Sequence, residues 1–502
     1  MDYELIETGL WSVLPPLIAI ALALLTKEVY SSLFFGLASG VVIYSLAGGG
    51  SLIDAAVAMF DMMCEKIAEN AYMIVFLALL WAVVLLVSKS GGSEAYGRWA
   101  EKRLKSKRGA SLAAIFLGVL IFIDDGFNCL TVGTVMRPVF DRARLSREKL
   151  AYILDATAAP ICIIAPVSSW AVAIAGDMGE RNGFSIFLAT IPYNFYAFLT
   201  ITALLFICLS GRDFGPMKHA EQAALSSAPE TDDSEIGNPK GRVFDLVLPI
   251  FVLIVCSILG MGYVGGWFDG VPFSEAIGEN PTAGFTLGAF AALCTAALLY
   301  LPRKIMSPKT FAESVVKGVE SIVPPMLILV LSWSLSGVCR KMIGTGEFIS
   351  GFVENTALPL QFLPLLLFLV AAVMAFSMGT SWGTFSILIP IVLMICTGSH
   401  AALLVPALGA TLAGSVYGDH CSPISDTTIL SSTGARCVHM RHVETQLPYA
   451  TLTAAACAVG YALVGFSVNP LVALAVSAVL LLAAFFLLSR QKKPRPLAKT
   501  EE

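Results

Sequence analysis

Charged residues are scarce in this chain of 502 residues. Asp, Glu, Lys and Arg together make up 14% of it, whereas hydrophobic residues make up 57%. Soluble domains carry about 25% charged residues, so this composition excludes an ordinary soluble protein and predicts an integral membrane protein. The mean hydropathy of +0.79 agrees with that class.

Several signatures of other protein classes are absent. The eleven cysteines form no CxxC pair, and many lie inside apolar runs, so we interpret them as small core residues rather than disulfides or metal ligands. No GxxxxGK[ST] or HExxH motif occurs, which argues against a nucleotide-driven pump and a metalloprotease. The N-terminus MDYELIETGLW lacks the basic region of a cleavable signal peptide. We therefore expect no enzymatic activity, no cofactor and no nucleic-acid partner.

Apolar runs of about 20 residues, the length that crosses a bilayer, recur along the chain. Two further apolar stretches, 110–140 and 358–397, are interrupted by polar residues near their middle. The predicted crossings are 11–26, 29–47, 70–88, 150–175, 184–209, 243–263, 282–301, 321–339, 402–425, 446–466 and 468–489.

The interruption FIDDGFN in the first of the two stretches indicates a hairpin. Residues 89–108 before the stretch contain seven Lys and Arg, and residues 137–149 after the interruption contain five. Loops rich in Lys and Arg stay in the cytoplasm. The stretch therefore enters and leaves on the same side as a re-entrant hairpin, with Asp124 and Asp125 near its tip. The same interpretation of 358–397 places SMGTSWGT at a second tip.

These hairpins predict an orientation in the bacterial inner membrane. The acidic N-terminus lies outside and the tail SRQKKPRPLAKTEE lies in the cytoplasm. Only four of the 32 Lys and Arg residues then face out, namely Lys66, Arg181, Arg340 and Lys341. Such a distribution follows the positive-inside rule.

Two halves of the chain resemble each other at a near-constant offset. Trp333 follows Trp81 by 252 positions, and SPISDTT at 422–428 follows APVSSWA at 165–171 by 257. Each half holds five crossings and one hairpin, and an odd number of crossings predicts the inverted-topology repeat of many secondary transporters. We expect a first repeat over 1–210, a flexible cytoplasmic linker over 211–242, a second repeat over 243–466, and an extra helix with a basic tail over 467–502.

Each half also contains one crossing broken by proline, at 155–170 and at 414–428. Proline removes a backbone donor, and Gly414 and Gly418 are expected to loosen the second helix. Irregular backbone at membrane depth lines a cavity, where Ser, Thr and Asp oxygens suit a cation such as Na⁺. The candidate ion or substrate ligands are Asp124, Asp125, Asn128, Asp155, Ser168, Ser169, Thr380, Ser381, Asp419, His420, Ser422, Ser425, Asp426, Thr427 and Thr428.

Simpler roles also fit several of these residues. Asp124 or Asp125 fits as the cap of a hairpin helix, and Asp426 as the cap of a half-helix. Asp155 fits as a structural partner of a neighbouring hydroxyl or peptide group. His420 fits as a satisfied core histidine. These alternatives stay open on the sequence alone.

The motifs resemble those of a known family. YGDHCSPISDTTILSS closely resembles the signature of the NhaC-type sodium/proton antiporter family, and FIDDGFNCLTVG and ILDATAAPICIIAPVSSW resemble its first-half motifs. The resemblance covers most of the chain apart from the linker and both tails. It implies Na⁺ and H⁺ as coupling ions, and an elevator-type mechanism in which two hairpins and two broken helices move against a scaffold. It also implies a homodimer in the lipid bilayer.

We therefore expect a secondary active transporter, a Na⁺/H⁺ antiporter with Na⁺ held at Asp155, Asp419 and Asp426. The alternative is a Na⁺- or H⁺-coupled transporter or exchanger of a small organic solute, such as an organic acid, amino acid or amine. Trp170 and Trp382 would suit such a larger ligand. A carboxylate that binds either Na⁺ or a proton predicts that Na⁺ affinity falls as pH drops.

Overall fold

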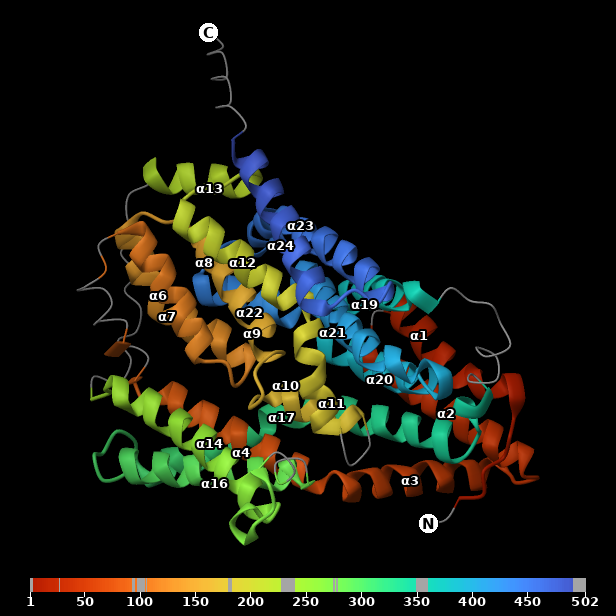
Figure 1. The fold of residues 1–502 in the computed structure, drawn as a ribbon. Coiled ribbons are helices and arrows are strands. Elements are labelled where there is room, and N and C mark those ends of the chain that lie inside the picture. Colours follow the sequence, from red (N-terminus) through yellow and green to blue (C-terminus); the bar gives the residue numbers. More distant parts are fainter. Residues whose placement is uncertain are drawn as a thin grey trace, which may run out of the picture.

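The described part of the chain is helical throughout. It contains no strand, and ten of its helices are long and apolar enough to cross a membrane, which confirms a multi-pass all-α membrane protein (Figure 1). The computed structural model describes residues 3–26, 28–92, 95–96, 104, 106–178, 183–226, 240–273, 276, 279–348 and 360–490.

Most helices of the first half follow the predicted apolar runs, because a spanning segment must satisfy its backbone groups internally; helix α3 matches no predicted crossing. The helices are α1 (Leu14–Thr26), α2 (Val29–Ala47), α3 (Leu52–Glu69), α4 (Ala71–Lys89), α6 (Lys107–Leu120), α7 (Asp125–Ala143), α8 (Arg147–Thr157), α9 (Ala159–Cys162), α10 (Ser169–Asp177), α11 (Gly183–Thr190) and α12 (Phe195–Ser210).

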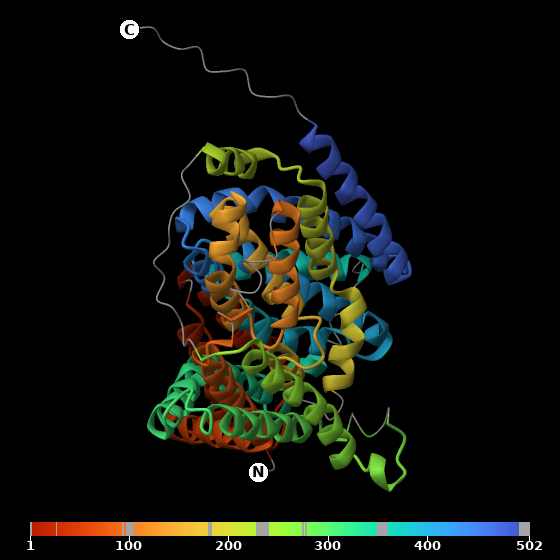
Figure 2. The same ribbon diagram turned by 90° about the vertical axis from the view of Figure 1, so that its left-hand side faces the viewer.

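The second half is also built of helices. Its elements, with the helix that joins the halves first, are α13 (Gly215–Ser226), α14 (Val243–Val264), α16 (Pro281–Tyr300), α17 (Pro308–Lys341), α19 (Leu363–Met378), α20 (Ser381–Ile395), α21 (Leu404–Cys421), α22 (Asp426–Ala435), α23 (His439–Gly465) and α24 (Pro470–Ser489). Helix α13 lies at the opposite end of the molecule from α14 and α16 in both views (Figure 2).

Both interrupted stretches form pairs of helices joined by a tight turn. Helices α6 and α7 contact each other, as do α19 and α20. Asp124 caps α7 by accepting a hydrogen bond from the backbone N–H of Phe127 at 2.9 Å. Gly379 adopts φ +67° at the second turn, where a side chain would be strained, and Thr380 caps α20. The helix–turn–helix form at both predicted interruptions is confirmed; the depth at which the tips end stays a prediction.

The two crossings that contain proline are broken. In the first, α8 ends at Thr157, the four-residue α9 carries Pro160 in its first turn, and α10 begins only after Ser168. In the second, α21 ends at Cys421 and α22 begins at Asp426. The second break is therefore short, and the first is long.

The expected loosening by two glycines is wrong. Helix α21 is continuous through Gly414 and Gly418. A Cβ at Gly414 would lie 2.9 Å from Ala371 Cβ, and one at Gly418 would lie 2.8 Å from Ala375 Cβ. These glycines allow α19 to pack closely against α21, as small residues do between membrane helices.

Three other expectations need correction. The crossing 184–209 is two helices, α11 and α12, because the 3₁₀ turn Ile191–Tyr193 carries Pro192 between them. The crossing 321–339 is part of the 34-residue helix α17. The predicted linker 211–242 is not flexible at its start, because α13 packs on α8 and α23. Residues 227–239 of the linker lie outside the described residues.

The hairpin of each half packs against the broken crossing of the other half. Helix α7 contacts α22, and α10 contacts α20. The first contact is close enough that a Cβ on Gly133 would lie 2.5 Å from the backbone carbon of Gly434. Broken segments from both halves of the chain are thus held together in the core.

Candidate functional site

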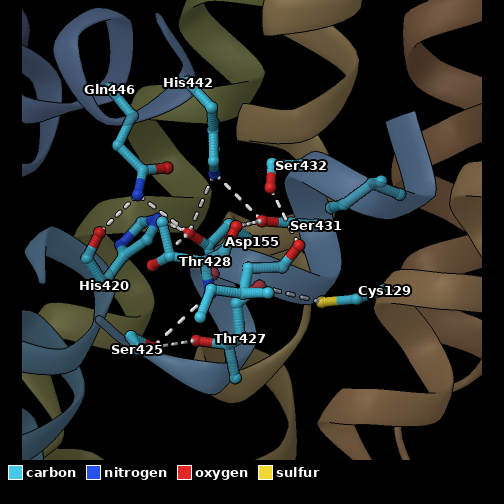
Figure 3. Close-up of polar contacts among 12 residues, drawn as sticks. Cys129, Asp155, His420, Ser425, Thr427, Thr428, Ser431, Ser432, His442 and Gln446 are labelled. Atoms are coloured by element: carbon cyan, nitrogen blue, oxygen red, sulfur yellow. Dashed lines mark hydrogen bonds and ion pairs between the residues drawn. The ribbon is translucent and has the colours of Figure 1, made fainter. Parts of the chain in front are cut away.

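Asp155, on the last turns of α8, is the centre of a buried polar network (Figure 3). Its Oδ2 accepts hydrogen bonds from Gln446 Nε2 at 2.8 Å, Thr428 Oγ1 at 3.3 Å and His442 Nε2 at 3.3 Å. Thr428 belongs to α22, and the other two donors belong to α23. One carboxylate of the first half is therefore bound by three side chains of the second half.

His442 is held in one tautomer by its neighbours. Its Nε2 also lies 2.9 Å from Ser431 Oγ, whereas its buried Nδ1 has no hydrogen-bond partner. A proton on Nδ1 would be left without an acceptor, which is costly for a buried group. A proton on Nε2, directed at Asp155, therefore satisfies the network best.

His420 faces the same carboxylate without bonding to it. Its Nδ1 lies 2.8 Å from the Tyr196 hydroxyl, and its ring stacks on Tyr152. Its Nε2 lies within ion-pair distance of Asp155 Oδ2 at 3.9 Å, too long for a hydrogen bond, and has no hydrogen-bond partner. His420 is therefore only half satisfied, and Gln446 binds both its backbone carbonyl and Asp155.

Asp419, one residue earlier, is a second buried carboxylate with an unused oxygen. Its Oδ2 accepts a hydrogen bond from Ser381 Oγ at 2.9 Å, and its Oδ1 has no hydrogen-bond partner. Ser381 also donates to the backbone carbonyl of Ser415 at 3.2 Å. The tip of the second hairpin thus docks on the second broken crossing.

Residues Gly379–Gly383 read GTSWG, which matches the GxSxG pattern of serine hydrolases. That pattern requires a strand before the serine and a base to activate it. Here α19 precedes the turn, and the Ser381 hydroxyl bonds a carboxylate and a backbone carbonyl. The Ser381 hydroxyl thus holds the hairpin tip against α21.

The first hairpin tip docks in the same way on the first broken crossing. Asp124 Oδ2 accepts a hydrogen bond from Ser169 Oγ at 3.3 Å, and Ser169 N–H donates to Ile123 O at 2.9 Å. The capping role left open for Asp124 is confirmed by the hydrogen bond that its carboxylate accepts from Phe127 N–H at the start of α7. Asp125 is half-buried, and its Oδ1 accepts a bond from Gly126 N–H at 3.1 Å.

Asn128 and Ser168 satisfy backbone groups freed by the first break. Asn128 Nδ2 donates to Thr157 O at 3.0 Å, to Gly118 O on α6 and to Ile121 O just after that helix. Ser168 caps α10 by accepting from Ala171 N–H at 3.0 Å, and its hydroxyl donates to Cys162 O at 2.9 Å. Both roles are those expected at a helix end with unsatisfied groups.

The second break is organised by Ser422 and Ser425. Ser422 Oγ donates to Phe376 O at 2.8 Å, while Ser425 caps α22 and lies 3.0 Å from Thr427 Oγ1. The cap is thus Ser425 rather than Asp426. Asp426 is exposed, and no hydrogen bond or ion pair joins it to another described residue.

The structure brings Thr428 and His420 to the carboxylate of Asp155. It also joins Asp419 to Ser381. It does not gather Asp155, Asp419 and Asp426 into one site: among the described residues no group of three or more His, Cys, Asp and Glu side chains could hold a metal ion. Trp170 and Trp382 pack edge to face with ring centroids 6.1 Å apart, as aromatic core residues do.

Sequence reasoning missed His442 and Gln446. Both lie near the start of α23, four positions apart and therefore on one helix face. The signal was present as HVETQLPY, a polar stretch that continues directly into the crossing 446–466. This stretch is equally typical of an ordinary loop, because its polar residues end where the apolar run begins.

Comparison with known proteins gives three findings. A model of the Na⁺/H⁺ antiporter family matches residues 170–466. An uncharacterized protein of Haemophilus influenzae is 39% identical over 509 residues, which cover 97% of each chain. A malate-2H⁺/Na⁺-lactate antiporter of Bacillus subtilis is 30% identical over 168 residues, 32% of this chain and 34% of that one. Asp155 and the first hairpin precede the segment matched by the family model.

A solved structure shares the fold. The YdaH transporter of Alcanivorax borkumensis superposes with a TM-score of 0.54 at 14% identity, covering 83% of this chain and 91% of that one. This likeness concerns the arrangement of the helices alone.

Proposed function

This chain belongs to the Na⁺/H⁺ antiporter family and is a multi-pass secondary transporter, and from that premise we propose that it exchanges Na⁺ for H⁺ across the bacterial inner membrane. The exchange uses the ion gradients alone and needs no cofactor. The observation that carries the proposal is the pair of buried carboxylates, Asp155 and Asp419, one on each broken crossing.

Asp419 is the better placed of the two to bind Na⁺ directly. Its Oδ1 is buried and has no partner, which is unfavourable unless a cation or a proton occupies it. Ser381 Oγ lies 2.9 Å from the other oxygen and adds a neutral oxygen of the kind Na⁺ prefers. One carboxylate oxygen cannot hold Na⁺ and a proton together, and that competition is the basis of exchange.

Asp155 couples this site to the rest of the molecule. It accepts hydrogen bonds from Thr428 and His442, and Gln446 joins it to the backbone carbonyl of His420, the residue next to Asp419. Movement of either broken crossing must therefore rearrange this network. Asp426, being exposed, serves at the approach to the site rather than as a direct ligand.

The inverted repeat and an elevator motion are part of the same proposal. They are supported by the matching pairs of contacts, α1 with α2 and α14 with α16, and α7 with α22 and α10 with α20. In this proposal the repeats span 1–210 and 243–466, and the two hairpins and two broken crossings move as one body. The remaining helices form the scaffold at a homodimer interface.

Transport in proteoliposomes tests the exchange. Purified protein is reconstituted with a pH-sensitive dye inside, and Na⁺ is added outside. We expect internal alkalinisation in the wild type and none in Asp419→Asn. A wild-type protein that moves Na⁺ without any proton movement would contradict the proposal.

A second candidate function is exchange of an organic acid coupled to Na⁺ or H⁺. The observation that favours it is the similarity to the malate-2H⁺/Na⁺-lactate antiporter over about a third of the chain. The same vesicles, loaded with malate and diluted into lactate, separate the two functions. Proton flux that requires an organic acid supports the second, and flux with Na⁺ alone supports the first.

A further inference from the structure

Two arginines share one aromatic ring where α12 and α24 end, close to the start of α13 (Figure 1). The guanidinium carbon of Arg490 lies 4.0 Å from the centre of the Phe486 ring, and that of Arg212 lies 5.4 Å from it. The two carbons are therefore no farther apart than the sum of these distances, which is close to the screening length of about 10 Å at 0.1 M salt. Like charges at this range repel each other, so the arrangement favours an anion beside them.

The acidic side chains nearby are already engaged by other cations. Asp213 follows Arg212 directly in sequence, but its Oδ2 lies 2.7 Å from Lys149 Nζ. Glu221 Oε2 lies 3.6 Å from the same Nζ and 3.5 Å from Lys107 Nζ. Within the part of the chain that the structure describes, no ion pair joins Arg212 or Arg490 to an acid. Both guanidinium groups therefore keep their full positive charge.

A pocket of about 360 Å³ opens beside Arg212, and Ser489, the neighbour of Arg490, also lines it. Its lining carries more basic than acidic side chains, namely Lys107, Arg108, Lys149, Arg212 and Lys218 against Asp213 and Glu221. Arg108 and Lys218, like Arg212, form no ion pair with another described residue. A phosphate group suits such a cluster, because a guanidinium group can bind it through two parallel hydrogen bonds.

The surface next to these cations is apolar and faces lipid. Of the ten candidate spans, α24 has the smallest buried share, 22%. Leu209, three residues before Arg212, is 50% exposed, and Leu487, three residues before Arg490, is 64% exposed. The acyl chains of a phospholipid would cover these leucines while its headgroup reaches the arginines. A phosphate dissolved in water would gain nothing from the leucines, so the surroundings favour a lipid.

We propose that a basic patch, made of Arg108, Arg212, Lys218 and Arg490, binds the phosphate headgroup of an anionic phospholipid. Basic pockets between membrane helices are sites of this kind. The pocket volume falls in the range of about 300–1,000 Å³ of small-molecule sites, so it admits a phosphate with its glycerol. In the predicted orientation the basic patch faces the cytoplasmic leaflet. The proposal goes beyond the proposed exchange and does not rest on it.

Titration of matched lipids tests the proposal on the full chain in a non-ionic detergent, after bound lipid has been removed. The probes are dioctanoyl phosphatidylglycerol, dioctanoyl phosphatidylcholine and glycerol phosphate, and native mass spectrometry and thermal unfolding report binding. We expect phosphatidylglycerol to bind at least about tenfold more tightly than phosphatidylcholine, because only the former carries a net negative charge. Equal binding of the two lipids would overturn the proposal.

Glycerol phosphate distinguishes a lipid site from a site for a soluble phosphate. It has the phosphate and the glycerol of the lipid but lacks the acyl chains that would cover Leu209 and Leu487. We expect no binding of glycerol phosphate at concentrations that saturate phosphatidylglycerol binding. Glycerol phosphate that binds as tightly as phosphatidylglycerol would overturn the assignment of a lipid.

Charge-removing variants locate the binding. Arg212→Gln and Arg490→Gln should each weaken phosphatidylglycerol binding about fivefold, the usual effect of one basic residue near an anionic surface. Both side chains are exposed, so the variants should unfold at the wild-type temperature without lipid. The control is Arg144→Gln, an exposed arginine just after α7 and outside the pocket, which should change binding less than about twofold. Equal losses in the three variants would indicate a general attraction to basic surface and overturn the proposal, as would unchanged binding in both Arg212→Gln and Arg490→Gln.

Phe486→Leu tests the shared ring without changing any charge. The ring holds both guanidinium groups, and its loss should weaken phosphatidylglycerol binding about two- to fivefold, the value of an exposed cation–π contact. Phe290→Leu, at an exposed phenyl ring on α16, is the control and should bind like the wild type. Unchanged binding in Phe486→Leu would contradict the arrangement on which the proposal rests.

Discussion

The carboxylate of Asp155 and the side-chain amide of Gln446 are 291 positions apart in sequence and 2.8 Å apart in the fold. The bond joins the first broken crossing to α23 of the second half. The same amide nitrogen binds the backbone carbonyl of His420. The Gln446 side chain therefore bonds to both broken crossings at once.

Replacement of Gln446 by Leu should destabilise the protein and impair transport. The buried carboxylate and a carbonyl both lose a donor, which costs about 1–3 kcal/mol each in stability. We expect a lower Tm in detergent and at least about tenfold slower Na⁺-driven proton flux. The control is Gln361→Leu, the same change at an exposed side chain; an equal loss in both variants would contradict the role given to Gln446.

His442→Gln should be better tolerated than His442→Leu. The His442 ring donates one hydrogen bond to Asp155, and a glutamine amide also carries donors, whereas leucine leaves the carboxylate without that hydrogen bond. Transport rates should rank wild type, Gln, then Leu. A leucine variant as active as the glutamine variant would show that the hydrogen bond is unimportant.

Gly133 and Gly434 permit the closest contact between the first hairpin and the second broken crossing. Gly133→Ala places a Cβ 2.5 Å from the backbone carbon of Gly434, so the helices must separate. We expect a cost of about 1–3 kcal/mol, as for other overpacked sites, measured as a lower Tm. Gly346→Ala is the control, because its Cβ would meet nothing within 4 Å.

The long apolar runs predicted the helices well because backbone groups in lipid leave no alternative to a helix. The bounds of α2 agree with the predicted run 29–47. The polar interruptions also marked both hairpin turns. The effect of Gly414 and Gly418 was predicted wrongly, because these glycines act by close contact with α19, and only the fold shows that α19 is their neighbour.

The candidate site was predicted only in part, because the sequence does not show which distant residues meet in the fold. Residues within one motif, such as Asp419 and Ser425, were found because the motif is locally unusual. Gln446 was missed, because it becomes notable only through a partner far along the chain. The exposure of Asp426 was likewise invisible from its acidic type and its place in the motif.

The predicted orientation can be tested with one native and one introduced cysteine. Cys64 is exposed on α3, and Arg142 is exposed in the last turn of α7. In a background without other cysteines, an impermeant maleimide should label Cys64 from outside the cell. Arg142→Cys should react only after the membrane is opened. Labelling of both from the same side would contradict the hairpin topology.

Na⁺ affinity should fall as pH drops, because a proton and Na⁺ compete for one carboxylate oxygen. A competing single site loses about tenfold in apparent affinity for each pH unit below the point where the proton binds. Na⁺ titrations at several pH values, followed by thermal unfolding, measure this slope. An affinity independent of pH between 5 and 9 would exclude direct competition.

Calorimetric titration of Na⁺ into wild type, Asp419→Asn and Asp426→Asn tests the central assignment most directly. We expect Na⁺ binding in the wild type, none in Asp419→Asn, and binding within about threefold of wild type in Asp426→Asn, because Asp426 is exposed and bonds to no other described residue. Wild-type Na⁺ binding in a folded Asp419→Asn protein would contradict the account.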